Sequence, residues 1–152
     1  MKTEQVVTVR EARQNDLQEI LKLYLFLHET TVPENNDRLK ETWNKIMEDP
    51  YHHLIVCELD GKIVSSCVCV IIPNLTRNVR PYAFVENVVT HKDYRKKGYA
   101  SLCLNYAKEI SETANCYKIM LLTGSKNKET LNFYKNAGYN NEDKTAFVQW
   151  LE

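Results

Sequence analysis

The chain has 152 residues, of which 43% are hydrophobic and 26% charged, proportions typical of one ordinary domain. Its 20 basic residues balance its 20 acidic residues, so it lacks the overall positive field that nucleic-acid binding usually requires. No apolar run approaches the roughly 20 residues that cross a bilayer, and the first residues carry no apolar export signal. We therefore expect one cytoplasmic domain over residues 1–152, without a membrane or nucleic-acid partner.

The five cysteines favour free thiols over disulfides or a metal site. Their number is odd, no two have the CxxC spacing, and four fall within apolar runs, where a thiol packs as a small hydrophobic side chain. They are Cys57, Cys67, Cys69, Cys103 and Cys116.

The N-terminal third predicts one strand and two helices. Val6–Arg10 has a strand pattern, and Asp16 follows as an N-cap, with Glu19 placed to complete a capping box. The first helix has an apolar stripe at helical spacing, and the second, which Pro50 ends, has another. The stripes consist of Leu17, Ile20, Leu21, Tyr24 and Leu27 or His28 in the first helix, and Leu39, Trp43, Ile46 and Met47 in the second.

The middle of the chain predicts a hairpin and a third strand. Runs rich in β-formers cover His53–Leu59 and Lys62–Ile72, and Asp60-Gly61 between them is a strong hairpin signal. After a polar loop, Tyr82–Thr90 is a further strand in which Glu86 is the single charge. A lone carboxylate among apolar residues needs a partner or a chemical role.

The last third predicts helix, strand, helix and strand in turn. A helical stripe covers Tyr99–Ile110, and Tyr117–Leu122 follows as a strand. Lys128–Ala137 predicts a helix closed by Gly138, and Thr145–Leu151 a final strand. Hairpins mixed with right-handed crossovers predict an α/β fold with one central mixed β-sheet flanked by about four helices.

A possible phosphate site follows the strand that ends at Thr90. The segment Arg95-Lys96-Lys97-Gly98-Tyr99-Ala100 leads directly into a helix. A helix N-terminus offers unpaired backbone N–H groups and a partial positive charge, and a preceding glycine lets the backbone curl around a phosphate. Taken alone, one glycine after three basic residues also fits a solvated turn.

The surrounding segments favour the phosphate site. Arg-x-x-Gly-x-Ala between a strand and a helix resembles the pyrophosphate-binding signature of the GNAT superfamily of N-acetyltransferases, Gln/Arg-x-x-Gly-x-Gly/Ala. The resemblance continues upstream over residues 81–94 and downstream over 127–139. The downstream part resembles the family's Asn-x-x-Ala-x-x-Phe-Tyr element, with Thr130 in place of alanine. The whole resemblance implies a GNAT-like acyl-CoA N-acyltransferase fold.

By this resemblance, acetyl-coenzyme A would bind along the strand and the loop. Val88, Val89 and Thr90 would pair through their backbone with the acetyl-pantetheine arm, as an added strand does. A bulge would open this strand beside Tyr117–Leu122 and free an N–H near Val88 for the thioester oxygen. Asn127 would contact the cofactor from the other side. The pyrophosphate would be held by Arg95, Lys96, Lys97, Gly98, Tyr99, Ala100 and Ser101.

Two residues are candidates for catalysis. Period-two alternation places Glu86 on one strand face with Phe84, Val88 and Thr90 and directs it towards the thioester as a general base. The resemblance places Tyr134 near the sulfur, where it would protonate the departing thiolate. Two alternatives stay open: Glu86 is salt-bridged at the sheet end or replaced by water relays, and Tyr134 belongs to an apolar helix face.

The other polar candidates are weaker. Arg77 and Arg80 precede the catalytic strand, where they either recognise an acidic group of the acceptor or remain solvated. His91 suits a structural role or a contact at the cofactor's edge better than catalysis. The remaining histidines lack metal-ligand spacing, so no metal is expected.

The sequence therefore predicts an N-acetyltransferase that moves the acetyl group of acetyl-coenzyme A directly to a primary amine of a small molecule or peptide. The alternative from another class is an acyl-coenzyme A-binding module without catalysis. A third hypothesis, a site for RNA phosphates, is disfavoured by the balanced charge. The acceptor, the acyl-chain length and the oligomeric state, a homodimer included, stay open.

Overall fold

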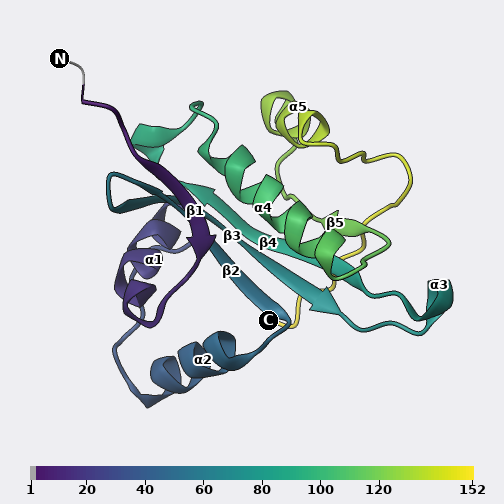
Figure 1. The fold of residues 1–152 in the computed structure, drawn as a ribbon, viewed down its shortest axis with the longest axis horizontal. Helices are drawn as coiled ribbons and strands as arrows, with labels where there is room; N and C mark the ends of the chain where they lie inside the picture. Colours follow the sequence, from purple (N-terminus) through teal and green to yellow (C-terminus); the bar gives the residue numbers. More distant parts are fainter. Residues whose placement is uncertain (1–2) are drawn as a thin grey trace.

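A computed structural model describes residues 3–152 as five strands and five helices, joined by loops and 3-10 turns (Figure 1). The elements are β1 (Val7–Glu11), α1 (Leu17–Leu23), α2 (Asp37–Glu48), β2 (His52–Leu59), β3 (Lys62–Ile72), α3 (Thr76–Val79), β4 (Tyr82–Thr90), α4 (Tyr99–Thr113), β5 (Ile119–Leu121) and α5 (Lys128–Asn136). The 3-10 turns cover Gln14–Asp16, Tyr24–Phe26 and Lys92–Tyr94.

The five strands form one mixed sheet in the order β1-β2-β3-β4-β5. The first four pair antiparallel, and β4 pairs parallel with β5, to which α4 connects it. Asp60 and Gly61 both adopt positive φ and make the tight turn between β2 and β3. The structure confirms the predicted mixed sheet and its hairpin, while β5 is shorter than the predicted Tyr117–Leu122.

Helices cover the two faces of the sheet and define two cores. On one face, called the α4 face below, α4 packs through Cys103 and Ala107, together with α5, over Ile55, Cys57, Val64, Cys67, Cys69 and Val85. On the other, called the α1 face, α1 and α2 pack over Leu54, Val56, Ile63, Val68 and Val89. All five cysteines are free and four are buried, as the sequence predicts.

The capping box predicted at Asp16 does not form. Asp16 is buried and its Oδ2 lies 2.7 Å from Nη1 of Arg10, whose other nitrogen lies 2.7 Å from Glu58. Glu19 instead accepts a hydrogen bond from the backbone N–H of Ile63 at 3.0 Å. Asp16 also accepts from the backbone N–H of Arg13 at 2.6 Å, so it holds the 3-10 turn before α1 against β1, while Glu19 ties α1 to β3; neither carboxylate caps α1.

The loop between β3 and β4 contains a left-handed turn. Arg77, Asn78 and Val79 have φ of 55°, 59° and 62°, a conformation that is costly for residues other than glycine. The side-chain amide of Asn74 donates to the carbonyls of Thr76 and Arg80 at 3.1 and 3.0 Å, which holds the turn. α3 is therefore a left-handed turn and not a regular helix.

The predicted final strand is wrong for this structure. Residues 137–152 form neither helix nor strand, and every residue from 140 onwards is exposed. In Figure 1 this segment leaves α5, swings wide of the sheet and returns behind it. Thr145–Leu151 has strand propensity, but a strand requires a neighbouring strand, and none is paired with it within the described residues.

Candidate active site

β4 and the edge strand β5 separate partway along β4. Their parallel ladder has three pairs and ends where Val85 faces Leu121. Beyond Val85, β4 continues for five residues to Thr90, and no described residue of β5 pairs with them. The backbone of this part of β4 is thus open on its β5 side.

A bulge in β4 lies at this opening. Asn87 has φ of 52°, and the register with β3 shifts so that Glu86 faces Val68 while Val89 faces Ser66. Two residues of β4, Asn87 and Val88, therefore span the single residue Cys67 on β3. The bulge that the resemblance implies is present, at the predicted strand and next to the predicted neighbour.

The bulge also changes which side chains share a face. Glu86 faces Val68, which belongs to the α1 face, but Val88 packs on the α4 face. The predicted common face of Glu86, Val88 and Thr90 is wrong, since the extra residue reverses the alternation beyond Glu86. Of the three residues predicted to share a face with Glu86, only Phe84 does so, because it pairs with Val70, which packs on the α1 face.

Glu86 is solvent-exposed on the α1 face. No basic side chain among residues 3–152 lies within ion-pair distance of it, which removes the support for a salt-bridged carboxylate. On the same side, burial raises the pKa of Tyr24 to about 12, and the nearby Asn87 side chain acts in the opposite direction. The sequence analysis singles out neither Tyr24 nor Asn87, although an asparagine inside a strand is a signal for left-handed backbone.

Tyr134 lies on the opposite face of the sheet from Glu86. It packs against the α4-face core, half-buried, with the rings of Phe133 and Tyr139 at centroid distances of 5.1 and 6.5 Å. Burial raises the pKa of its hydroxyl, and the nearby Cys67 thiol adds to this. Because Cys67 faces the bulge, Tyr134 and Glu86 approach the same level of β4 from its two sides.

The loop before α4 forms a concave run of backbone amides. Lys96 and Gly98 have φ of 61° and 89°, and alternation of left-handed with ordinary residues turns successive N–H groups inward. The first helical hydrogen bond of α4 runs from the N–H of Leu102 to the carbonyl of Gly98, and no side chain caps the helix. The amides of Tyr99 to Ser101 precede that bond and are free for an anion.

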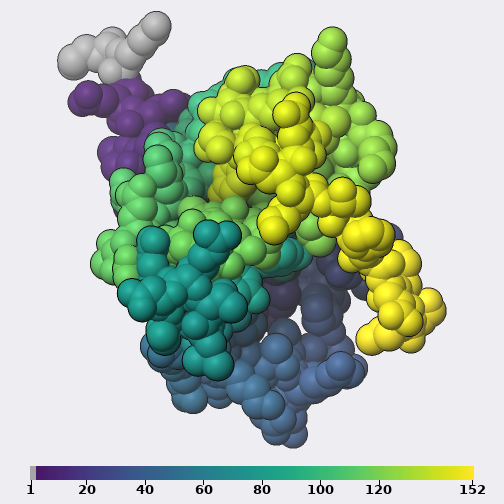
Figure 2. All heavy atoms as spheres, turned by 90° about the vertical axis from the view of Figure 1, so that its right-hand side faces the viewer, coloured from purple at the N-terminus to yellow at the C-terminus, as the bar shows by residue number. Residues whose placement is uncertain are grey.

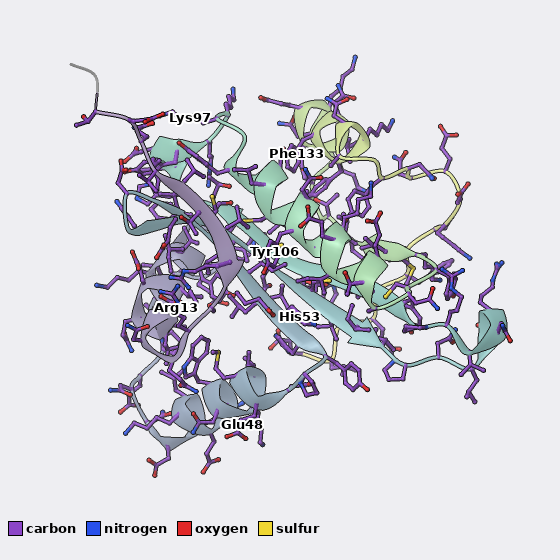
Figure 3. All side chains as sticks on the ribbon, in the orientation of Figure 1. Arg13, Glu48, His53, Lys97, Tyr106 and Phe133 are labelled. Atoms are coloured by element: carbon purple, nitrogen blue, oxygen red, sulfur yellow. The ribbon has the colours of Figure 1, made fainter. Side chains whose placement is uncertain are left out.

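Lys96 and Lys97 of this loop each contact a neighbouring side chain. Lys96 Nζ lies 3.2 Å from Glu129 Oε1, which joins the loop to the first turn of α5. Lys97 Nζ lies 5.6 Å from the centre of the Tyr94 ring. Figure 3 shows Lys97 on this loop and Phe133 on α5, both at the end of the molecule opposite α2.

The remaining predicted site residues have structural contacts of their own. Asn127 caps α5, since its Oδ1 accepts from the N–H of Glu129 at 2.8 Å. Arg80 donates to the carbonyls of Asn115 and Cys116 at 3.2 and 3.1 Å. Arg77 stacks over the Tyr117 ring at 5.4 Å. Both arginines precede β4, so they lie at the far end of that strand from the loop before α4 (Figure 1).

No helix in residues 3–152 is long and apolar enough to cross a membrane. Nor does this range hold a group of three or more His, Cys, Asp or Glu side chains placed to bind a metal ion.

Comparison with known proteins agrees with this geometry. A putative acetyltransferase from Agrobacterium tumefaciens str. C58 has the same fold, with a TM-score of 0.88, 35% identity, and coverage of 94% of this chain and 99% of that chain. An uncharacterized N-acetyltransferase of Methanocaldococcus jannaschii is 26% identical over 95% of this chain, and a glucosamine 6-phosphate N-acetyltransferase of Trypanosoma brucei brucei is 34% identical over 52% of it.

The chain spans only part of these curated relatives, 64% of the length of the first and 52% of the second. The model of the acetyltransferase (GNAT) family matches residues 16–139, from the start of α1 to just beyond α5. This range contains the bulged strand, the amide-lined loop and both faces of the opening. The chain therefore belongs to the acetyltransferase (GNAT) family.

Proposed function

We propose that the chain transfers the acetyl group of acetyl-coenzyme A to a primary amine of a small molecule or peptide. The observation that carries the proposal is the opening between β4 and β5, followed directly by the amide-lined loop at the start of α4. Coenzyme A joins an extended thioester arm to a pyrophosphate. The open edge of β4 matches the extended arm, and the N-terminus of α4, which follows it along the chain, matches the pyrophosphate.

The loop residues fit a pyrophosphate. Its P–O⁻ oxygens need convergent N–H donors, which the left-handed residues Lys96 and Gly98 and the uncapped start of α4 supply. Lys97 adds positive charge, and Arg95 fixes the loop. The free edge of β4 at Val88, Val89 and Thr90 offers backbone groups to the amides of the pantetheine arm.

The chemical roles that we propose for Glu86 and Tyr134 follow from their positions. Bound acetyl-coenzyme A supplies a thioester carbonyl, and transfer forms a C–N bond while the C–S bond breaks. Glu86 receives the proton that the amine must lose. Tyr134 gives its hydroxyl proton to the departing thiolate. The backbone near Val88 donates to the carbonyl oxygen as charge develops on it.

The base has the harder task of the two. A primary ammonium with a pKa near ~10.4 is deprotonated in fewer than about one molecule in a thousand at pH 7, a handicap of about 4–5 kcal/mol. A thiolate with a pKa near ~8.5 leaves tolerably without a proton. Burial raises the pKa of Tyr134 further and makes it a weaker acid than free tyrosine, so Glu86 should contribute more than Tyr134.

The acceptor should approach from the α1 face, because Glu86 is exposed there. We expect Tyr24 and Asn87 to border its binding site, since Asn87 is exposed next to Glu86 and Tyr24 packs on the same face. Arg77 and Arg80 lie farther along β4, where they would contact only a long acceptor or its acidic group. The name of the Trypanosoma relative makes glucosamine 6-phosphate one amine to include in a screen.

Calorimetry with acetyl-coenzyme A, followed by chromatographic detection of free coenzyme A with a panel of amines, tests the proposal. Chromatography avoids thiol reagents, which the five free cysteines would consume. We expect micromolar binding and amine-dependent release of coenzyme A. Binding without release for every amine would favour the non-catalytic module, and absence of binding would overturn the proposal.

A further inference from the structure

A cavity, called the α2 cavity below, lies where the end of α2 meets the end of β1 and the beginning of β2. Its volume is about 240 Å³. An engineered cavity of ~150 Å³ holds benzene, so the α2 cavity suits a ligand of about six to eight non-hydrogen atoms. Figure 2 shows open space between α2, in blue, and the C-terminal segment, in bright yellow, so on this side the segment does not cover the helix.

The α2 cavity is separate from the reacting position on β4. Leu54 forms part of its wall and pairs with Val68 on β3, which pairs in turn with Glu86. Neighbouring strands lie ~4.8 Å apart, so about 10 Å separate the backbones of Leu54 and Glu86. A ligand small enough for the α2 cavity therefore does not also reach Glu86.

An unpaired stretch of backbone borders the α2 cavity. β1 and β2 pair for the last time at Glu11 and Ile55, after which the N–H of Ala12 donates to the carbonyl of Leu54 at 2.8 Å. β2 begins at His52, so its first residues extend beyond the end of β1. Alternation along the strand turns the carbonyl of His52 to the same side as that of Leu54. No strand among the described residues pairs with β2 there, so this carbonyl is a free acceptor.

Two carboxylates line the α2 cavity, and each has an oxygen to spare. Oε1 of Glu11 lies 2.5 Å from Nδ1 of His53. Oδ1 of Asp49 accepts a hydrogen bond from the backbone N–H of Tyr51 at 2.8 Å. Within residues 3–152, the second oxygen of each carboxylate takes part in no hydrogen bond or ion pair. No lysine or arginine of the described chain lines the cavity, so its charged groups favour a cation.

The rest of the wall is compatible with a cation on an alkyl chain. Burial lowers the pKa of His52 below its ordinary value, so this ring is uncharged at pH 7 and does not repel a cation. Ile46 and Met47, in the last turn of α2, and the buried Leu54 supply apolar surface. An alkyl chain of a few carbons is removed from water by packing against them.

An ammonium group on a short alkyl chain therefore matches both parts of the wall. An ammonium donates three hydrogen bonds. The α2 cavity offers three acceptors, one each from Glu11, Asp49 and the backbone carbonyl of His52. A carboxylate or phosphate ligand would instead face two like charges. We propose that the α2 cavity is a binding site for a small aliphatic ammonium ion, distinct from the site at which acetyl transfer takes place.

Methyl NMR tests this site, because one of the three methionines lines the cavity. Chains with ¹³C-methyl methionine are titrated with n-pentylamine at pH 7, and Met47→Leu identifies the Met47 signal. We expect this signal to shift saturably, with a dissociation constant of about 1 mM, while the signal of Met120 on β5 stays in place. 1-Pentanol and pentanoate, of the same length, should bind at least about tenfold more weakly. Absence of a saturable shift, or equal binding of the three compounds, would overturn the proposal.

Variants that remove charge but keep shape test the two carboxylates. Glu11→Gln/Asp49→Asn retains an acceptor for each present partner, and we expect it to bind pentylamine roughly tenfold more weakly or worse. The matched control Glu29→Gln/Glu34→Gln removes the same charge from exposed residues before α2 and should bind like the wild-type chain. Unchanged affinity in the first variant would refute the proposal.

The titration also separates this site from the proposed transfer reaction, because it requires no acetyl transfer. Adding coenzyme A should leave the shift of the Met47 signal and the affinity for pentylamine unchanged. Binding of pentylamine only in the presence of coenzyme A would place the amine at the acceptor site and would overturn the assignment to the α2 cavity.

Discussion

Arg95 donates a hydrogen bond of 3.3 Å to the backbone carbonyl of Phe26, 69 residues earlier in the chain. Its Nε donates a second, of 3.1 Å, to the carbonyl of Thr90. The guanidinium thus joins the 3-10 turn after α1 to the end of β4 and positions the loop between β4 and α4. The first position of the phosphate-binding signature therefore has a structural contribution that does not depend on charge alone.

Replacing Arg95 should weaken cofactor binding through this loss of positioning. Arg95→Ala removes both hydrogen bonds, at a cost of about 1 kcal/mol in unfolding free energy, because the side chain is exposed. Arg95→Lys retains the charge but lacks the planar fork that reaches two carbonyls, so it should bind coenzyme A almost as poorly as Arg95→Ala. Calorimetry compares the two variants, with Arg38→Ala on the exposed side of α2 as the control. Full affinity in Arg95→Lys would mean that charge alone matters.

Gly98 is the second residue on which the loop depends. Its φ of 89° is strained for any residue with a side chain, although a Cβ there would meet nothing within 4 Å. Gly98→Ala should therefore distort the backbone amides rather than block them, and strain of about 1–2 kcal/mol predicts roughly tenfold weaker binding of coenzyme A. Gly124→Ala is the matched control, because that glycine has neither positive φ nor a close neighbour. Equal affinities for the two variants would argue against an amide-lined site.

Local signals were sufficient to predict this loop and most of the fold. Arg95 to Ala100 lies between an apolar strand and an amphipathic stripe, and both elements formed where their periodicity indicated. The hairpin at Asp60-Gly61 is equally local, since only two residues must adopt positive φ. Tertiary packing did not need to override any of these preferences.

Features that depend on distant partners were not predictable in the same way. The reversal of faces beyond Glu86 comes from the pairing of β4 with Cys67, which no period in the sequence records. Asp16 pairs with Arg10, which also pairs with Glu58, and it does not cap α1. Thr145–Leu151 has the pattern of a strand but no strand partner among the described residues, because pattern indicates propensity and not the presence of a neighbour.

The buried pair of Arg10 and Asp16 predicts a pH-dependent contribution to stability. The hydrogen bond from Arg10 holds the pKa of Asp16 below its ordinary value, so the carboxylate stabilises the fold above its unfolded pKa and loses this effect as pH falls through the folded pKa. Asp16→Asn should cost about 1.5–3 kcal/mol in urea unfolding at pH 7, and the difference should narrow only below about pH 4.

The exposed Glu29→Gln supplies the control for this measurement, and it should unfold like the wild-type chain at every pH. If Asp16→Asn and wild type differed by less than about 0.5 kcal/mol at pH 7, the ion pair would contribute little to stability. A difference that persisted unchanged to pH 3 would contradict the assignment of the effect to the Asp16 carboxylate.

Catalysis should depend more on Glu86 than on Tyr134. Glu86→Gln removes the acceptor for the amine proton while keeping the size of an exposed side chain, so kcat should fall about 10²–10³-fold at pH 7, within the usual range for a general base. The remaining rate should rise with pH, because only amine deprotonated by solvent reacts. Tyr134→Phe removes a hydroxyl whose pKa burial has already raised, and we expect a loss of tenfold or less. The pH–rate profiles of both variants, measured by release of coenzyme A, separate the roles. Equal losses, or a Glu86→Gln profile identical to wild type, would show that a water relay or another group accepts the proton.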